Sequence, residues 1–434
     1  MFRSWQAITL WKRVLVGLFL GLAIGLAIRY GMPERAVWIG DTWFKPFGDA
    51  FVRLIKMLII PLIATTLVAG VTAMGDPKKL GSLGLRTIGL YLCTTFFAVS
   101  LGLAMGTFVK PGVGVKYDTA SAADIASVSG KMEQAEQAGG FVQRLLEIIP
   151  SNPIAALSTG DVLPTIFFSI LVGIGILFVG KAAEPVKVFF ESASEVVMKI
   201  TMLIMELAPY GVFMLMAWVM STKGIDVLYN LFWLAIALYA TCVLQIVFVY
   251  GVFIVKGILR LPAKQFFRGI LDAQGVAFST ASSSATLPVT ISCAEKNLGV
   301  DKSVAGSVLP LGATINMDGT AIYLGLVALF AAQAGGFDLT LTQYVLVAMT
   351  ATLVSIGAAG IPSAGLLLAA TVLDVVGVNQ SQSLLVIAFI FPFDRLLDMM
   401  RTVTNVSGDI AVACAVAKWE DELDAEVFKT EAEV

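Results

Sequence analysis

The sequence predicts an all-α polytopic membrane protein, and three observations lead to this fold class. Hydrophobic residues make up 58% and charged residues 14% of the chain, whereas a soluble domain is about half apolar and about a quarter charged. The mean hydropathy is +0.87, and several apolar runs reach the roughly 20 residues that a helix needs to cross the hydrocarbon core. Two further segments are apolar but interrupted by Ser, Gly and Pro, which is typical of re-entrant helical hairpins.

The runs that are long enough to span follow one another along the chain. They are approximately 14–30, 47–74, 84–109, 163–180, 193–220, 228–256, 303–333 and 378–418. Several exceed a single crossing, which tilt or extra length outside the membrane accommodates. Arg3, Lys12 and Arg13 precede the first run, and positive charge there predicts a cytoplasmic N-terminus.

Segments outside these runs are polar, small or acidic. Residues 111–140 combine small and polar side chains and are expected to form a loop outside the membrane. Residues 419–434 are acidic, and we expect a solvated cytoplasmic tail rather than a binding site. No short apolar stretch with a small-residue cleavage site opens the chain, so no removable signal peptide is expected.

Several function classes find no support in the composition. The four cysteines, Cys93, Cys242, Cys293 and Cys414, lie in apolar or small-residue context without CxxC spacing, and we interpret them as packing residues. The chain has no histidine, which removes the usual proton shuttle and metal ligand. It has no nucleotide-binding motif and no evident nucleophile–base pair, so neither ATP-driven work, nor enzymatic activity, nor a nucleic-acid partner is expected.

Two segments do not fit a simple count of spans. Residues 264–297 contain "AFSTASSSATLPVTISCA" and residues 340–376 contain "VSIGAAGIPSAGLLLAATVL". Each consists of two short apolar stretches around a tip of small residues, which predicts a re-entrant hairpin whose open backbone lines a cavity. The alternative is a pair of ordinary kinked helices with small packing faces. A long helix follows each segment, one with "NMDGT" and one with "NVSGD", which indicates an internal repeat of the inverted type.

A polar stripe is expected on the helix predicted for residues 378–418. Its members fall within an arc of about 100° at helical spacing, and they are Asp394, Asp398, Arg401, Thr402, Asn405 and Asp409. A charge at mid-bilayer costs a few kcal/mol and is normally paired and functional. Two alternatives are a structural ion pair such as Asp398 with Arg401, and a stripe at the cytoplasmic end. The second is weakened because apolar residues continue to Val416.

The chemistry of the stripe matches an acidic amino acid and a hard cation. Arg401 presents a planar fork that can hold a carboxylate bidentately, and Asp398, about one turn earlier, can accept from an ammonium group. Hard oxygens are offered by Asp409, Asn405, Asp318 and Asn316. Because no soft ligand lies nearby, Na⁺ fits better than a transition metal.

Four motifs, in this order along the chain, resemble those of the glutamate/aspartate transporters, the dicarboxylate/amino acid:cation symporters. They are "SSSATLP" at 282–288, "LPLGATINMDGT" at 309–320, "SIGAAGIPSAG" at 355–365 and "DMMRTVTNVSGD" at 398–409. "VRLIKMLIIPLI" near residue 57 and "NPIAALSTGDVLPTIFF" near residue 160 are similar as well. The resemblance covers about residues 12 to 418.

The resemblance implies a homotrimer of elevator-type transporters. Each protomer would have eight transmembrane helices plus two re-entrant hairpins and lie in a cell membrane, expected to be a bacterial inner membrane, with both termini cytoplasmic. The implied parts are scaffold helices 1–2 at 12–75, transport-domain helix 3 at 82–110, scaffold helices 4–5 at 141–222, the transport-domain core at 226–418 and the tail at 419–434. The core would comprise helix 6, hairpin 1, helix 7, hairpin 2 and helix 8.

The resemblance also implies the site residues for L-aspartate or L-glutamate and for up to three co-transported Na⁺ ions. Arg401 would hold the side-chain carboxylate and Asp398 the amino group. The substrate residues are Ala281, Ser282, Ser283, Met317, Thr320, Ile361, Asp398, Arg401, Thr402 and Asn405. The Na⁺ residues are Tyr91, Thr94, Thr95, Gly312, Thr314, Asn316, Asp318, Ser355, Ile356, Ala358, Asn405 and Asp409.

The sequence departs from the family pattern at the place of a second arginine. Many members carry it just before the serine run or directly after the first Asp of the last motif, positions that are Ala281 and Met399 here. Arg395 lies one turn away. Members that exchange protons and potassium carry a glutamate where this chain has Leu324, which predicts Na⁺-driven uptake without either ion.

Two other hypotheses remain open at the level of sequence. One is a C4-dicarboxylate:cation symporter of the same fold, although dicarboxylate members tend to lack the Asp at position 398. The other is an ion channel, which also uses re-entrant loops and which saturable, sodium-dependent uptake would exclude.

Overall fold

The computed structural model describes most of the chain, and every regular element in the described part is a helix. The described residues are 10–72, 84–115, 146, 148–222, 224–358, 360, 363–378 and 380–429. Six helical stretches among them are long and apolar enough to cross a membrane. They are Lys12–Gly31, Pro33–Thr72, Leu85–Val109, Val162–Met205, Leu228–Leu259 and Lys302–Ala334. The predicted all-α polytopic class is confirmed, while the total of eight crossings stays a prediction.

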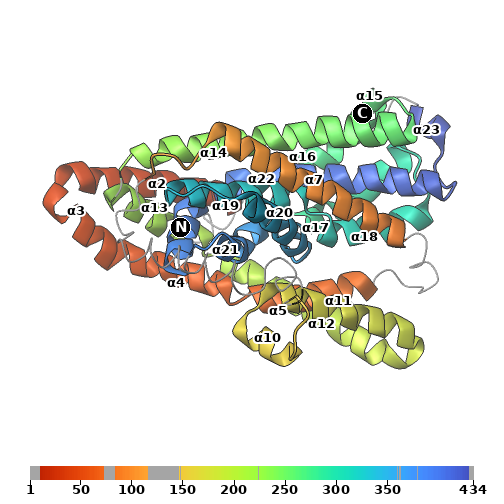
Figure 1. The fold of residues 1–434 in the computed structure, drawn as a ribbon, viewed down its shortest axis with the longest axis horizontal. Coiled ribbons are helices and arrows are strands. Elements are labelled where there is room, and N and C mark those ends of the chain that lie inside the picture. The colour runs from red at the N-terminus through yellow and green to blue at the C-terminus, as the bar shows by residue number, and fades with distance from the viewer. Residues whose placement is uncertain are drawn as a thin grey trace, which may run out of the picture.

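The helices of the first half of the chain form two groups. The elements are α2 (Leu10–Gly31), α3 (Pro33–Ile39), η1 (Gly40–Phe44), α4 (Lys45–Lys56), α5 (Ile59–Thr72), α7 (Leu85–Val109), α10 (Pro153–Thr159), α11 (Val162–Val179), η3 (Gly180–Ala183), α12 (Glu184–Met205) and α13 (Ala208–Thr222). α13 packs along α2 with α4 beside it, and α11 and α12 pack on α5. Figure 1 shows the α5–α11–α12 group set off below the other helices.

Small residues explain the close contact of α2 with α13. Gly17, Gly21 and Gly25 recur every four residues on one face of α2. A Cβ at Gly21 would lie 2.6 Å from the carbonyl oxygen of Phe213, and one at Gly25 would lie 2.7 Å from that of Ala217. A stripe of this kind lets two helix backbones approach where lipid leaves little hydrophobic drive for association.

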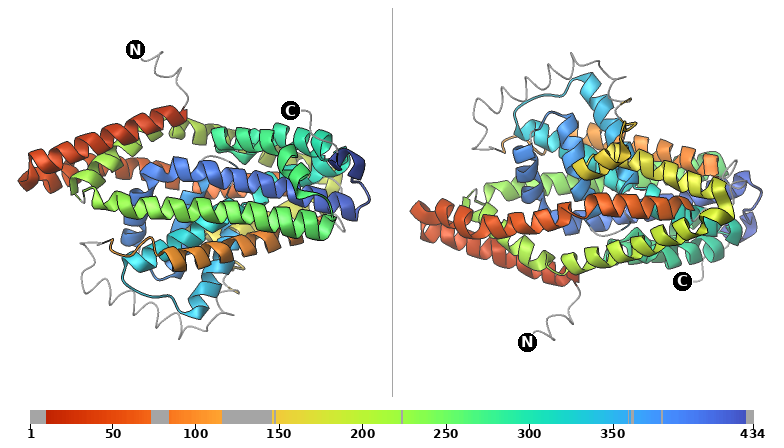
Figure 2. Two further views of the ribbon diagram at one scale, coloured as in Figure 1. Left: turned by 90° about the horizontal axis from the view of Figure 1, so that it is seen from above. Right: turned by 90° about the horizontal axis from the view of Figure 1, so that it is seen from below.

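The second half of the chain builds the helices that surround the polar stripe. The elements are α14 (Asp226–Leu244), η4 (Gln245–Leu259), α15 (Ala263–Gly269), α16 (Leu271–Thr280), α17 (Ser283–Ser292), η5 (Cys293–Asn297), α18 (Lys302–Ile315), α19 (Asp318–Ala334), α20 (Leu341–Ile356), α21 (Ala364–Val375), α22 (Gln380–Trp419) and α23 (Ala425–Lys429). α14, α7 and α22 pack against one another (Figures 1 and 2). α19 packs against both α7 and α22 and is almost wholly buried.

Both interrupted segments fold as pairs of short helices. α16 and α17 have ten residues each, and they pack against each other across the Ala281–Ser282 link. α20 and α21 have 16 and 12 residues and also pack together. This arrangement favours hairpins over ordinary kinked helices, and we call the pairs the first hairpin (α16–α17) and the second hairpin (α20–α21). Their depth in a membrane stays a prediction.

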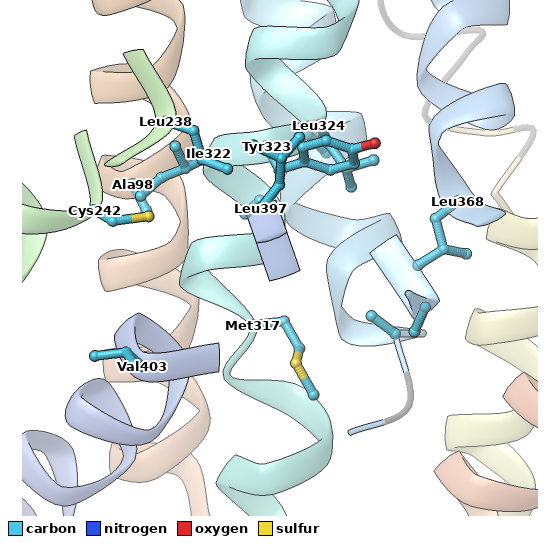
Figure 3. Packing of buried hydrophobic residues seen from close by; sticks show 14 of the residues in the cluster. Ala98, Leu238, Cys242, Met317, Ile322, Tyr323, Leu324, Leu368, Leu397 and Val403 are labelled. Carbon is cyan, nitrogen blue, oxygen red and sulfur yellow. The ribbon is translucent and has the colours of Figure 1, made fainter. Parts of the chain in front are cut away.

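A long helical element follows each hairpin, as the internal repeat requires. After the first hairpin, α18 ends at Ile315 and α19 begins at Asp318, so Asn316 and Met317 form a non-helical link. Figure 3 shows Met317 at this link. After the second hairpin, α22 runs for 40 residues without a break. The order of elements repeats, and the inverted relation between the two halves remains a prediction.

Residues 420–429 are attached to the rest of the chain at a few points, although the acidic side chains Glu422, Asp424 and Glu426 are exposed, and the cytoplasmic placement of the tail stays a prediction. Leu423 forms an antiparallel bridge with Val300, and the amide of Asp424 donates to the Gly299 carbonyl oxygen at 2.8 Å. Phe428 on α23 is fully buried. The acidic composition of the tail did not predict this attachment, because the attachment depends on one aromatic side chain and on backbone pairing with a loop far away in the sequence.

Candidate functional site

The tips of the two hairpins meet each other. The hydroxyl of Ser282 donates to the carbonyl oxygen of Gly360 at 2.6 Å, and the amide of Ser284 donates to the same oxygen at 3.2 Å. Ser282 also begins α17, because its hydroxyl oxygen accepts from the amide of Ala285 at 3.1 Å. Ala281 precedes it with a φ of 49°, a left-handed turn that ends α16. The Ser-rich and Gly-rich tips are therefore joined by side-chain and backbone hydrogen bonds.

Arg401 lies fully buried on α22 between two carboxylates. Its Nε and Nη2 donate to Asp398 Oδ1 at 3.1 and 2.6 Å, and Nη2 lies 3.0 Å from Asp394 Oδ1. The guanidinium carbon stands 4.1 Å from the ring centroid of Tyr323 on α19, a cation–π contact. The ion pair that was one alternative thus forms in this structure. Arg401 Nη1 nevertheless has no hydrogen-bond partner in the described part of the chain, which leaves the guanidinium a free donor there.

Asp398 connects this cluster to the second hairpin. Its Oδ2 accepts from the backbone amide of Ser363 at 2.7 Å, directly before α21 begins. Thr402 donates its hydroxyl to the Asp398 carbonyl oxygen at 2.9 Å. Thr320 is buried on α19, and a Cβ at Gly365 would lie 2.8 Å from its methyl group. α22, α19 and the start of α21 therefore converge on one point.

The substrate residues expected on α22 and on the link between α18 and α19 contact each other. Asn405 accepts on Oδ1 from the Gly319 amide at 2.8 Å and donates from Nδ2 to the Met317 sulfur at 3.1 Å. Ser283 is buried at the start of α17. Ile361, expected to contribute backbone, lies outside the described residues.

The link between α18 and α19 is tied to Asp409. Asn316 donates from Nδ2 to Asp409 Oδ1 at 2.9 Å and to the Asn405 carbonyl oxygen at 3.3 Å. A Cβ at Gly312 would lie 2.5 Å from Asp409 Oδ1, so α18 approaches α22 closely only because residue 312 has no side chain. The four residues expected to form one Na⁺ site are thereby in one place, and all offer hard oxygens.

A second group of predicted Na⁺ residues is equally compact. Thr94 and Thr95 donate to the Tyr91 carbonyl oxygen at 3.0 and 2.8 Å. Thr95 also donates to Asp318 Oδ1 at 2.6 Å, and the hydroxyl of Thr94 stands 3.5 Å from Asn316 Oδ1. All five oxygen-bearing groups are buried.

Sequence reasoning missed two residues that hold Asp318. Tyr250 donates its hydroxyl to Asp318 Oδ2 at 2.6 Å, and Gln245 donates from Nε2 to the same oxygen at 3.1 Å. Both side chains are fully buried on η4. Their signal in the sequence was weak: a lone glutamine and a tyrosine within an apolar run.

The third group of predicted Na⁺ residues lies near the tip of the second hairpin. Ser355 and Ile356 end α20, and the amide of Ala358 donates to the Ser355 carbonyl oxygen at 2.9 Å. Thr314 is on α18, where a Cβ at Gly70 of α5 would lie 3.0 Å from its hydroxyl. α18 packs against α20, and a Cβ at Gly360 would lie 2.5 Å from the carbonyl oxygen of Ala313, the residue before Thr314. Among the described residues, no group of three His, Cys, Asp or Glu side chains is placed to hold a metal ion.

Polar atoms without a hydrogen bond gather at the Arg401 cluster, although one of them, Asp394 Oδ1, is in an ion pair with Arg401. Among the described residues, ten buried side-chain nitrogen or oxygen atoms have no hydrogen bond, and six belong to this cluster. They are Tyr323 Oη, Asp394 Oδ1 and Oδ2, Arg395 Nε and Nη1, and Arg401 Nη1. Buried polar groups in native proteins are nearly always satisfied, so a concentration of exceptions indicates a place for a polar, charged ligand.

Comparison with known proteins gives matches along nearly the whole chain. A family model described as the sodium:dicarboxylate symporter family matches residues 10–419. The proton/sodium-glutamate symport protein of Bacillus caldotenax is 36% identical over 420 residues, 96% of each chain. The proton/glutamate-aspartate symporter of Escherichia coli (strain K12) is 33% identical over 95% of this chain and 93% of its own. A C4-dicarboxylate transport protein of Azorhizobium caulinodans is 36% identical over 95% of this chain and 90% of its own.

Proposed function

Because this chain belongs to the sodium:dicarboxylate symporter family, we propose that it couples inward Na⁺ movement to the uptake of aspartate or glutamate. The family makes it a multi-pass membrane transporter, not an enzyme, that moves an acidic amino acid or a dicarboxylate together with a cation. The single observation that carries the narrower proposal is the buried Arg401–Asp398 pair with a free donor on Arg401.

An acidic amino acid has complementary groups for this pair. Its side-chain carboxylate takes the guanidinium donors of Arg401, and its ammonium group takes the oxygen of Asp398 that Arg401 now occupies. Asp394 remains 3.0 Å from Arg401 Nη2 and keeps the guanidinium in place during this exchange. One ion pair is thus replaced by two without leaving a buried charge alone, which is the condition for burying charges at acceptable cost.

Substrate binding at Asp398 also affects the second hairpin, which we propose as the extracellular gate. Asp398 Oδ2 holds the Ser363 amide, and Gly360 is held by Ser282. Opening the second hairpin breaks both contacts, whereas a bound substrate that orders Asp398 and Ser283 favours the closed state.

Three Na⁺ ions are proposed as co-substrates on the residues expected for them. Asp318 with Thr94 and Thr95 supports one, Asp409 with Asn405 and Asn316 supports another, and the end of α20 supports the third. These donor sets consist of carboxylate, amide, hydroxyl and carbonyl oxygens, which suit a hard monovalent cation.

The family resemblance supports the rest of the proposal: a homotrimer in a cell membrane, with a scaffold and a transport domain that slides as an elevator. In each protomer, eight helices would span and the two hairpins would re-enter. The separation of α5, α11 and α12 from the α14–α7–α22 layer is consistent with such a division (Figure 1). The second hairpin faces the scaffold group, because a Cβ at Gly357 would lie 2.9 Å from Ile166 of α11.

A second candidate function is C4-dicarboxylate symport. Its support is the similarity to proteins named C4-dicarboxylate transport protein at up to 36% identity. A dicarboxylate has no ammonium group for Asp398, so Asp398 would stay on Arg401 and repel the second carboxylate. Coupling to protons is the alternative on the cation side, because several relatives are named proton symporters.

Proteoliposome uptake distinguishes these candidates. Radiolabelled aspartate should accumulate under an inward Na⁺ gradient, and unlabelled glutamate should compete better than succinate or malate. Accumulation driven by a pH gradient without Na⁺, or preferred inhibition by succinate, would overturn the proposal for the cation or for the substrate respectively.

A further inference from the structure

We propose that Arg395 is a second anion-recognising residue of the substrate site, which binds the α-carboxylate of the amino acid at the tip of the first hairpin. This inference rests on the proposed function and adds the residue that holds the substrate's other carboxylate. It is carried by the contact of Arg395 with the hairpin tip and by its two unpartnered, buried nitrogens.

Arg395 extends from α22 to the tip of the first hairpin. Its Nη2 donates to the carbonyl oxygen of Thr280 at 2.8 Å, one residue before the left-handed Ala281 and two before Ser282. On α22 it lies three residues before Asp398 and seven before Thr402, spacings that place it on the side of the helix that carries the stripe. The guanidinium is therefore held between the stripe and the end of α16.

A role limited to capping α16 does not account for this arginine. The last carbonyls of a helix lack partners within the helix, and an arginine commonly binds them. That role uses Nη2 alone, while Nε and Nη1 have almost no solvent-accessible surface and no hydrogen-bond partner among the described residues. Leaving buried N–H groups unpaired carries a free-energy penalty, which a bound carboxylate would remove.

The charges around Arg395 favour an anion when the substrate is present. The charged groups that act on it are the carboxylates of Asp398 and Asp394, which attract it, and the guanidinium of Arg401, which repels it. When the substrate ammonium engages Asp398, the two arginines become the cationic groups left for two carboxylates. Arg401, between Asp394 and Tyr323, takes the side-chain carboxylate, and Arg395, at the hairpin tip beside Ser282 and Ser283, takes the α-carboxylate.

This assignment predicts different changes in ligand affinity when each of the two arginines is lost. All amino acids have an α-carboxylate, so loss of Arg395 should weaken aspartate and asparagine equally. Loss of Arg401 should weaken aspartate alone. The ratio of the two affinities therefore reports which carboxylate each arginine binds. A purely structural role for Arg395 is distinguished by the maximal rate, which it would lower as well, and by Arg395→Lys, which keeps the charge.

The experiment compares Arg395→Gln, Arg395→Lys and wild type in proteoliposomes, with Arg29→Gln as the matched control. Gln keeps an N–H donor for the Thr280 carbonyl but removes the charge. Arg29 also binds helix-end carbonyls, those of Ser221 and Thr222, but on the distant α2. KM and maximal rate for aspartate, and the inhibition constant for asparagine, are measured at saturating Na⁺.

For Arg395→Gln we expect KM for aspartate and the inhibition constant of asparagine both to rise about tenfold, the effect of losing one charge-assisted contact. The maximal rate should stay within about twofold, Lys should restore part of the affinity, and Arg29→Gln should match wild type. An unchanged KM, a loss confined to the maximal rate, or a loss for aspartate alone would overturn the assignment. If uptake by the wild-type protein did not depend on Na⁺, the proposed function would be contradicted instead. The role of Arg395 would then still be tested by measuring the binding of aspartate and asparagine to the wild-type and variant proteins by thermal shift.

Discussion

Replacing Asp318 by Asn should remove a sodium site while leaving the fold intact. The carboxylate accepts from Thr95 on Oδ1 and from Tyr250 and Gln245 on Oδ2. An asparagine with its oxygen at the Oδ2 position still accepts from Tyr250 and Gln245. Its nitrogen then faces Thr95, whose hydroxyl can rotate to accept and already donates to the Tyr91 carbonyl oxygen. The hydrogen bonds of Tyr250, Gln245 and Thr95 to this side chain can thus be kept, so the change removes mainly the charge.

The size of the effect follows from the charge. Two unit charges about 4 Å apart interact by about 4 kcal/mol at an effective dielectric constant of about 20, and about 1.4 kcal/mol corresponds to a tenfold change in affinity. Relaxation and the remaining oxygens reduce the loss, so we expect the half-saturating Na⁺ concentration for aspartate uptake to rise between about tenfold and a thousandfold. At saturating Na⁺, aspartate affinity should recover, because the two ligands affect each other's binding reciprocally.

The assay is aspartate uptake or binding titrated with Na⁺ at constant ionic strength, with a thermal-unfolding measurement on each purified protein. Asp301→Asn is the matched control: Asp301 is the exposed N-cap of α18, accepts from the Ser303 amide at 2.7 Å, and Asn caps a helix about as well. A well-folded Asp318→Asn protein with the Na⁺ dependence of wild type would refute the assignment of Asp318 to sodium.

Four further predictions concern the stripe, the tips, the tail and the coupling ions. Arg401→Cys should weaken aspartate binding at least about tenfold and strengthen competition by serine relative to aspartate; aspartate affinity equal to wild type in an uptake assay would contradict its role. Ser282→Ala removes the contact with Gly360 and the cap of α17, which is worth about 1 kcal/mol, so aspartate affinity measured in equilibrium binding should fall a few fold, and no change would count against tip closure. Phe428→Ala should release the docked tail and expose the bond after Lys418 to trypsin, a cut that limited proteolysis should not find in wild type. Leu324 is fully buried among apolar side chains, so uptake should persist when choline replaces internal potassium and no pH gradient is applied, and a collapse of uptake would contradict this.

The sequence predicts best those features that depend only on residues close together along the chain. The Ser-rich and Gly-rich tips break two apolar segments locally, and α16–α17 and α20–α21 form where those breaks predict them. The stripe on α22 depends only on helical periodicity, and Asp394, Asp398 and Arg401 do meet. The acidic side chains of the tail predict solvent exposure, and Glu422, Asp424 and Glu426 are exposed. What they do not predict is that backbone pairing with Val300 and the burial of Phe428 attach this segment to the rest of the chain.

Contacts between helices that are far apart along the chain produce no comparable pattern in the sequence. Gln245 and Tyr250 hold Asp318 across more than 60 residues of sequence, and neither lies in a motif. The bond from Arg395 to Thr280 spans 115 residues and arises because the first hairpin ends beside α22. Such contacts depend on how elements pack, and periodicity on a single element does not determine packing.

The arrangement of the link between α18 and α19 gives a physical reason for coupling between cation and substrate. Asn316 binds Asp409 and the Asn405 carbonyl, and the Asn405 side chain binds the Gly319 amide and the Met317 sulfur. Asp318 follows Met317 directly and is held from the opposite side by η4. A cation at Asp318 or Asp409 therefore fixes both ends of a two-residue link that also orients Asn405, next to Arg401 on α22. A ligand that orders this link lowers the conformational cost of ordering it for the second ligand, so sodium and substrate should each strengthen the binding of the other.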